Sequence, residues 1–310
     1  MIRSLRTLLL LVLAVLFLSS SADAADKLRL LIIDGQNNHN WRVMTPPMKA
    51  KLESTGRFVV EVATTPGGKG AKEDWDKFRP DFSKFDVVLS NYNGQSWPEP
   101  VNKGLEKFVS GGGGLVIIHA ANNSFGGWKE YNKMIALGWR NNKYGDRLTV
   151  DDSGKPVITP AGKGPGAGHG RQHAFEIVVR DSEHPVMKGM PKKWMHARDE
   201  LYHGQRGPAK LHLLATAWSD PEREAHWGER THGTGDHEPM VHTVQYGKGR
   251  VFGTAMGHVD GNAPLGSGPW PAMECRGFTT LIQRAAEWAA TGQVTQSIPE
   301  TFPSAHSVSL

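Results

Sequence analysis

Histidine, amide and aromatic residues stand directly after four short apolar runs of the sequence. The runs at 28–33, 85–90, 115–118 and 250–255 are typical of buried strands. Imidazole can move protons or bind a metal, while amides and tryptophan suit a polyhydroxylated ligand. The residues in these positions are His39, Asn37, Asn38 and Trp41, then Asn93 and Trp97, then His119, Asn122 and Asn123, and finally His258.

The elements that must position these residues alternate between strand and helix. Further strands are predicted at 58–63 and 174–179, and helices at 46–54, 98–110 and 273–290. This alternation predicts an α/β fold with a mostly parallel, doubly wound sheet flanked by helices, as in flavodoxin. Ligands of such sheets bind at the carboxyl ends of the strands, so the four polar groups are expected to converge.

The second half of the chain is less regular. A strand is predicted at 211–218, and a hairpin at 241–255 turns at Gly247-Lys248-Gly249. Residues 140–172 are rich in Gly, Asn and Asp and are predicted to form a long loop of functional importance. We expect one α/β domain over 25–293 and a loose polar tail over 294–310.

Acid–base chemistry is assigned to three residues. His119 follows its strand at the strand-to-helix turn, where many α/β enzymes place a reactive side chain. Glu200 is adjacent to Asp199, and neighbours in an extended chain point to opposite faces, so one of the two is expected in a pocket. Glu200 is assigned there beside Tyr202, and His39 completes the catalytic group. The alternative is a solvated surface pair.

A second cluster of histidines raises the alternative of a divalent metal centre, with zinc as the candidate ion. His169 and His173 are four residues apart, a spacing that binds metals on a helix, but the flanking glycines favour a loop. His203 follows further along and completes the candidate ligand set. Loop spacing constrains geometry little, so the sequence leaves open whether a metal binds.

The N-terminus has the three parts of a secretory signal peptide. Arg3 and Arg6 precede an apolar run at 8–18, and Ala22-Asp23-Ala24 follows as a cleavage site. The run is shorter than the roughly 20 residues that span a bilayer. We therefore expect residues 1–24 to be removed, and the rest to be secreted or periplasmic with no membrane anchor.

Composition excludes two further classes of protein. The 36 basic and 31 acidic residues are interspersed, without a basic block, so no nucleic-acid partner is expected. Cys275 is the single cysteine, which rules out a disulfide within the chain. The sequence does not indicate an oligomeric state.

Several segments, taken together and in order, resemble the ThuA-like (trehalose utilisation) family. The resemblance covers roughly 28–292. The segments are Leu31-Ile-Ile-Asp-Gly35 followed by His39-Asn-Trp41, Gly113-Gly-Leu-Val-Ile-Ile-His119, His184-Pro-Val-Met-Lys-Gly-Met-Pro191, Asp199-Glu-Leu-Tyr202, Pro239-Met-Val241, and Gly247-Lys-Gly-Arg-Val-Phe-Gly253 with Gly257-His258.

The resemblance implies a class I glutamine amidotransferase-like fold and a role in disaccharide or keto-sugar catabolism. His119 stands where amidotransferases carry a nucleophilic cysteine, so glutaminase chemistry is not expected. We predict an exported protein that hydrolyses, eliminates or isomerises a small glycoside or keto-sugar by His/Glu acid–base chemistry, with or without a metal. The alternatives are a non-catalytic sugar-binding module and a metal-dependent hydrolase of a non-sugar substrate.

Overall fold

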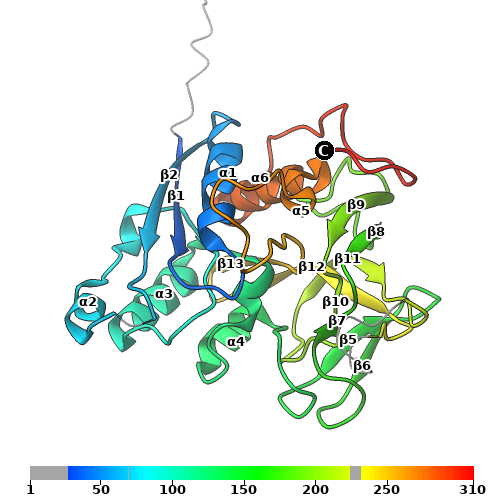
Figure 1. Cartoon of the computed structure of the whole chain (residues 1–310), viewed down its shortest axis with the longest axis horizontal. Coiled ribbons are helices and arrows are strands. Elements are labelled where there is room, and N and C mark those ends of the chain that lie inside the picture. The colour runs from blue at the N-terminus through cyan, green and yellow to red at the C-terminus, as the bar shows by residue number, and fades with distance from the viewer. Residues whose placement is uncertain (1–26, 69, 224–231) are drawn as a thin grey trace, which may run out of the picture.

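The computed structural model describes residues 27–68, 70–223 and 232–310, so the predicted signal peptide lies outside the described residues. A mixed sheet runs through the molecule in the order β2-β1-β3-β4-β13-β12-β11-β8-β9 (Figure 1). In chain order, the strands of this series are β1 Leu28–Asp34, β2 Phe58–Thr64, β3 Val87–Ser90, β4 Gly114–Ile118, β8 His173–Val179, β9 Lys193–Asp199, β11 His212–Trp218, β12 His237–Tyr246 and β13 Gly249–Thr254.

The sheet has a parallel half and an antiparallel half. Strands β2, β1, β3, β4 and β13 pair in parallel, and from β13 onward through β12, β11, β8 and β9 every pairing is antiparallel. The predicted α/β fold with parallel core strands flanked by helices is confirmed, and antiparallel strands extend the sheet on one side. We use "parallel half" and "antiparallel half" for these two regions below.

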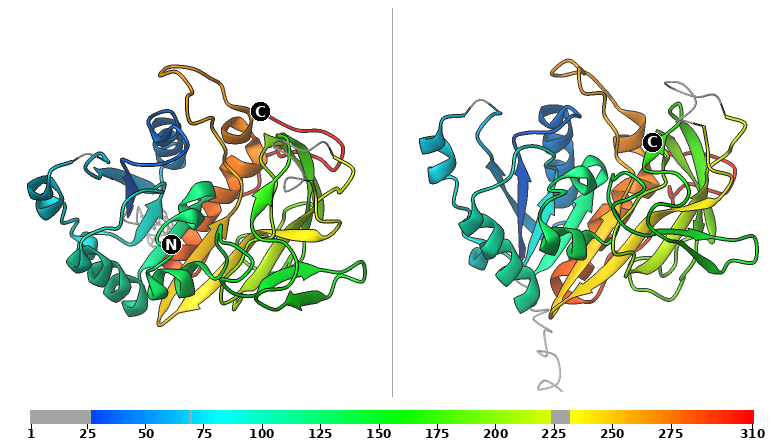
Figure 2. Two further views of the ribbon diagram at one scale, coloured as in Figure 1. Left: turned by 60° about the horizontal axis from the view of Figure 1, so that its bottom comes forward. Right: turned by 90° about the horizontal axis from the view of Figure 1, so that it is seen from below.

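Helices cover both faces of the parallel half (Figure 2). Because successive side chains of a strand point to opposite faces, Leu30 and Ile32 of β1 pack with α1 and α6, while Leu31 and Ile33 pack with α3 and α4. This is the doubly wound arrangement. The helical elements are α1 Trp41–Glu53, α2 Lys72–Lys77, η1 Phe82–Lys84, α3 Glu99–Gly111, η2 His119–Asn123, α4 Lys129–Ile135, α5 Pro271–Glu274 and α6 Arg276–Thr291.

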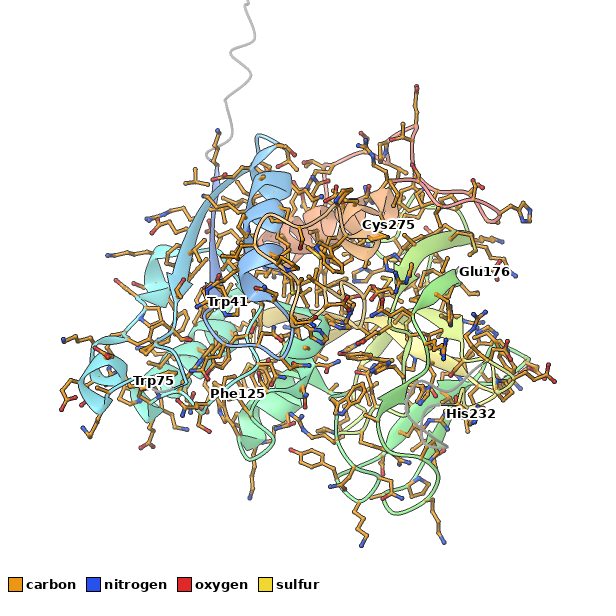
Figure 3. The ribbon with its side chains drawn as sticks, in the orientation of Figure 1. Trp41, Trp75, Phe125, Glu176, His232 and Cys275 are labelled. Atoms are coloured by element: carbon orange, nitrogen blue, oxygen red, sulfur yellow. The ribbon has the colours of Figure 1, made fainter. Side chains whose placement is uncertain are left out.

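Two helix boundaries differ from the prediction. Helix α1 begins at Trp41 instead of 46, because Asn40 accepts a hydrogen bond from the Arg42 amide and caps the helix five residues earlier. The helix predicted at 273–290 is split at Cys275 into α5 and α6 (Figure 3).

The region 140–172 is not one long loop. It contains the hairpin β5 Arg147–Val150 and β6 Pro156–Thr159, and then the short strand β7 Gly168–His169, which pairs with β10 Tyr202–His203. Strand β9 was also missed, because its sequence KWMHARD interrupts apolar with basic residues. Strands β5, β6 and β9 belong to the antiparallel half, while β7 and β10 form a separate two-stranded sheet, which we count with that half below.

The tail at 294–310 was expected to be loose but is held against the domain. Buried Arg284 donates hydrogen bonds to the Gln296 carbonyl and to carbonyls at 185–188, and Glu287 accepts from Thr295. The Met195 amide donates to the Ser304 carbonyl. In the part of the chain that the structure describes, no helix has the length and apolar character to cross a bilayer.

Candidate functional site

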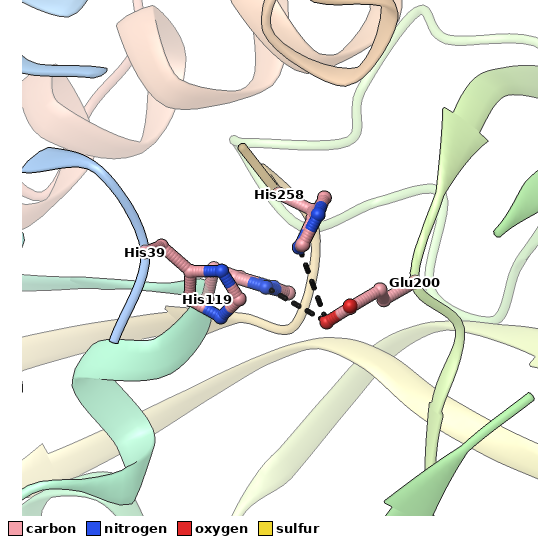
Figure 4. A group of neighbouring side chains, drawn as sticks. All are labelled: His39, His119, Glu200 and His258. Carbon is pink, nitrogen blue, oxygen red and sulfur yellow. Dashed lines mark ion pairs between the residues drawn. The ribbon is translucent and has the colours of Figure 1, made fainter. Parts of the chain in front are cut away.

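Three imidazoles and one carboxylate meet at the carboxyl ends of the parallel strands. The ligand atoms of His39, His119, Glu200 and His258 lie within 4.8 Å of one another, and all four residues are buried (Figure 4). Among the described residues, this is the group of histidines, cysteines and carboxylates with the geometry to hold a metal ion. The predicted convergence of strand-end residues therefore occurs in the structure.

The two halves of the sheet contribute unequally to this group. His39 follows β1 just before α1, His119 follows β4 directly, and His258 follows β13, so the parallel half delivers all three histidines. Glu200 follows β9 at the far edge of the antiparallel half. The site is complete because the chain directly after this edge strand places Glu200 within 4.8 Å of the histidine ligand atoms.

Each imidazole is anchored by the nitrogen that faces away from the group. His39 Nδ1 donates to the Val259 carbonyl at 3.0 Å and His119 Nδ1 donates to the Ala255 carbonyl at 2.6 Å, since a carbonyl oxygen can only accept. His258 Nε2 lies 2.8 Å from Asp260 Oδ1. Of the remaining nitrogens, His119 Nε2 and His258 Nδ1 face Glu200, and His39 Nε2 lies 3.1 Å from Asn38 Nδ2. Metal-binding histidines carry outer partners of this kind.

Glu200 faces the inner nitrogens. Its Oε2 lies 3.5 Å from His119 Nε2 and 3.2 Å from His258 Nδ1. Burial would raise the pKa of Glu200, but the hydrogen bonds and charge of His119 and His258 hold it well below its usual range. Its carboxylate is therefore ionised at neutral pH.

The histidines differ in charge. Burial, together with His119 and His258 nearby, lowers the pKa of His39 to about 3, so its ring is neutral. Burial also lowers the pKa of His258, but the neighbouring carboxylates, Glu200 foremost, outweigh it and raise the value to about 9. Without a metal, His258 and Glu200 form a buried ion pair. A cation that bound here would replace the proton of His258.

His119 has the least access to solvent of the four. Its side chain is fully buried, its φ of 46° is unusual for a residue with a side chain, and Tyr202 Oη lies 3.0 Å from its Nε2. A buried ring closed off in this way cannot reach a substrate proton directly. The geometry therefore favours His119 as a ligand over the acid–base role predicted from its position.

A cavity of about 690 Å³ opens in front of the group. His39, Glu200 and His258 form part of its wall, and the rings of Trp139 and Tyr202 meet edge-on with centroids 4.6 Å apart. Half-buried His169 also lines the cavity, with Nε2 3.5 Å from Glu200 Oε1. The polar wall is completed by Asn38, Asn123, Asp260 and Asn262.

Several residues predicted to contact a ligand lie outside this cavity. Trp97 is packed in the core against Tyr92 and Phe125, because its apolar ring is buried more favourably there. Trp41 lies beside Arg42 at the start of α1 (Figure 3).

Three further amides predicted to contact a ligand, those of Asn37, Asn93 and Asn122, instead form hydrogen bonds with neighbouring protein groups. Asn93 donates to Asn38 Oδ1 at 2.6 Å, Asn37 Oδ1 accepts from the His39 amide, and buried Asn122 donates to Gln205. Asn38 and Asn123 are therefore the two predicted amides with direct access to a ligand.

The predicted metal set His169, His173 and His203 does not converge. His173 Nδ1 donates to the carbonyl of the next residue, Ala174, and buried His203 contacts the Ser219 hydroxyl at 3.2 Å. The physical reason is that β7 and β8 place His169 and His173 in different strands. His169 alone reaches the cavity.

Trp139, Asp260 and Asn262 line the cavity but were missed in the sequence. Asp260 and Asn262 follow His258 in the same strand exit, which is a signal that the strand-end rule could have used. Trp139 has no such signal. Its neighbour Arg140 is buried and donates to the carbonyls of Asn123 and Ser124, which ties the Trp139 segment to the η2 turn.

Arg206 holds the segment before β7 in the same manner. Its side chain is fully buried and, within the described part of the chain, donates to backbone carbonyls, which accept in place of a carboxylate. These carbonyls belong to Gly145, Thr159, Pro160, Lys163 and Pro165, all in the segment before β7. The segment that leads to His169 is therefore held by one buried cation in addition to the pairing of β7 with β10.

Comparisons with known proteins agree with the fold and the family resemblance. Residues 31–289 match the model of the ThuA family, described as trehalose utilisation. The crystal structure of a ThuA-like protein from Parabacteroides merdae is 44% identical, with 91% of this chain and 97% of that chain covered and a TM-score of 0.83. A ThuA-like protein from Bacteroides uniformis shares the fold at 16% identity, with 86% and 93% of the two chains covered and a TM-score of 0.54. No protein of curated function matches the chain.

Proposed function

Because the chain belongs to the ThuA (trehalose utilisation) family, we propose that it is a carbohydrate-active enzyme with a divalent metal centre. The proposed ligands are His39, His119, Glu200 and His258, and the substrate is a small glycoside or keto-sugar. The observation that carries the proposal is the arrangement of the three rings: each outer nitrogen is held by an oxygen, and one ligand atom from each ring lies within 4.8 Å of Glu200.

The donor set fits a borderline divalent ion. Three imidazoles and one carboxylate suit zinc or a neighbouring first-row metal better than calcium or magnesium, which prefer oxygen. His258 Nδ1 is buried and makes no well-formed hydrogen bond, although it lies 3.2 Å from Glu200 Oε2. A cation would give this nitrogen a partner and offset the cost of burying the carboxylate.

The cavity wall suits a sugar. Trp139 and Tyr202 present aromatic surface against which the C–H face of a ring can pack, and Asn38 and Asn123 offer both donors and acceptors to hydroxyl groups. Its volume of about 690 Å³ lies within the usual range for small-molecule sites, which is roughly 300–1,000 Å³.

Proton transfer is assigned to His169, whose Nε2 lies 3.5 Å from the Oε1 of the proposed ligand Glu200. A bound metal would polarise a carbonyl or hydroxyl oxygen of the substrate. On a keto-sugar, His169 would take the proton from the carbon beside the carbonyl and return it to the leaving oxygen. His169 has 19% side-chain exposure and can reach the substrate, unlike the buried His119.

A combined metal and sugar assay tests the proposal. We expect chelator-treated protein to regain one equivalent of zinc, cobalt or manganese, and the loaded protein to be stabilised by a sugar or 3-keto-sugar. A ligand at about 100 times its dissociation constant adds roughly 2.7 kcal/mol of stability. We also expect product from a panel of keto-sugars and disaccharides with wild type, and none with Glu200→Gln. Absence of metal uptake would overturn the proposed metal centre, and absence of any sugar response would overturn the proposed substrate class.

The same assay separates the two alternatives. A sugar-binding module would be stabilised by a sugar but would yield no product in wild type. A hydrolase of a non-sugar substrate would take up one metal and show no response to any sugar. We further propose that the protein acts after export, which a reporter fused to residues 1–30 would test.

A further inference from the structure

A buried carboxylate next to the proposed metal ligands joins the two halves of the sheet. Asp199 is the last residue of β9, and its side chain is fully buried. Its Oδ1 accepts hydrogen bonds from the amides of Glu200 at 2.7 Å and His258 at 3.1 Å. Its Oδ2 accepts from the Gly257 amide and from His196 Nε2, both at 2.7 Å. Two of these four donors are the backbone of ligand residues.

No strand pairing among the described residues connects the end of β9 with the end of β13. Strand β9 lies at the edge of the antiparallel half and is separated from β13 by three strands in the sheet order. Gly257 follows β13 with a φ of 116°, and a Cβ there would lie 2.9 Å from the ring of Phe278. The turn that carries His258 is therefore packed on one side and tied to Asp199 on the other.

His196 and Cys275 complete the support behind Asp199. Burial would lower the pKa of His196, but Asp199 and the Cys275 thiol outweigh it and raise the value to about 9. Burial likewise would raise the pKa of Asp199, and His196 lowers it. A cysteine, a histidine and an aspartate have the composition of a nucleophilic triad. Here the thiol is fully buried, so the trio cannot meet a substrate.

We infer that Asp199 is the positioning residue of the proposed metal centre: it fixes the backbone of Glu200 against that of His258 and thereby sets the separation of their ligand atoms. The inference rests on the proposed function, since it concerns the same site. Outer partners of metal ligands typically change metal affinity by about 10–100-fold when mutated.

The variant Asp199→Asn tests the inference. It keeps the side-chain volume but turns an NH₂ group towards backbone amides that need an acceptor. We expect the dissociation constant for zinc to rise by about 10-fold or more, and the visible absorption spectrum of the cobalt-loaded protein, which reports ligand geometry, to change. His196→Gln leaves Asp199 in place and should raise the dissociation constant less. If Asp199→Asn does not fold, the zinc affinity of His196→Gln still tests the inference.

Asp181→Asn is the matched control. Asp181 accepts from the amides of Glu183 and His184 and lies 2.8 Å from His212 Nε2, so it has the same kinds of partners away from the site. We expect its zinc affinity and cobalt spectrum to equal those of wild type.

The outcomes separate the inference from the proposed function. Wild-type affinity and spectrum in Asp199→Asn or His196→Gln, with only the melting temperature lowered, would show a merely structural role and overturn the inference alone. Failure of wild type itself to bind zinc or cobalt would overturn both.

Discussion

The two halves of the sheet position their site residues by different means. In the parallel half, His39, His119 and His258 come from the ends of strands whose register is fixed by continuous ladders and by helices on both faces. In the antiparallel half and the small β7–β10 sheet counted with it, His169 and the segment after α4 that carries Trp139 are held by buried arginines that donate to backbone carbonyls. The difference shows that one site can combine residues set by topology with residues set by single side chains.

The comparison predicts that the antiparallel half is the more fragile. Arg206→Met would leave several buried carbonyls without a donor, and we expect it to lower the free energy of unfolding by about 3–5 kcal/mol. The melting temperature would fall by roughly 10 °C. Arg250→Met is the control in the parallel half. Arg250 also donates to carbonyls, at the end of α6, but is only half-buried, so about 1 kcal/mol is expected. Equal losses in a calorimetric comparison would break the distinction.

The ligand from the antiparallel half should matter as much as those from the parallel half. Glu200→Gln removes the negative charge of the group, and we expect zinc affinity to fall by about 100-fold or more, that is about 2.7 kcal/mol. Isothermal titration would measure it. Glu176→Gln, on the exposed face of β8, removes an equal charge and should leave the affinity unchanged (Figure 3). Unchanged zinc affinity in Glu200→Gln would show that the antiparallel half contributes no ligand to the metal centre.

Acid should weaken the strand at the boundary between the halves. Burial lowers the pKa of His242 in β12 to about 4, below the value of roughly 6.5 in an unfolded chain. The neutral ring therefore stabilises the fold above pH 6.5, and this contribution is lost as the pH falls towards 4. His242→Gln, which can still donate to the Ile135 carbonyl, should lose about 2 kcal/mol less than wild type between pH 7.5 and 5. Urea unfolding curves that shift equally in both proteins would contradict this.

The smallest effect concerns two tryptophans. Trp139→Ala should weaken sugar binding by about 1 kcal/mol, because an aromatic face is lost, while zinc binding stays unchanged. Trp41→Ala, in the parallel half and outside the cavity, should leave sugar affinity at its wild-type value. The reverse result would restore the ligand contact predicted for Trp41 and remove that of Trp139.

Sequence reasoning succeeded where one physical rule governs position. The strand-end rule predicted the convergence of His39, His119 and His258, because parallel strands must end at the same edge. It could not tell that Trp97 would turn into the core, since an aromatic ring at a strand exit can pack either way. Glu200 was assigned to a pocket by a different argument, the opposite orientation of neighbouring residues in an extended chain, which does not show what faces it.

The positions of the site residues in the antiparallel half could not be predicted, for a different reason. The position of His169 depends on Arg206, about forty residues away in sequence, and that of Trp139 on carbonyls of η2. Contacts of this kind leave no periodic pattern and no local motif. The predicted ligand set of His169, His173 and His203 failed because its spacing was read along the chain, whereas the residues that converge come from four separate elements.

The central claim is that both halves build one metal centre, and X-ray absorption of the zinc-loaded protein tests it most directly. We predict three imidazole nitrogens at about 2.0–2.1 Å and one carboxylate oxygen at about 2.0–2.2 Å, with one nitrogen lost in His39→Ala. A spectrum with fewer than two imidazoles, or one that is the same in His39→Ala and wild type, would contradict the account.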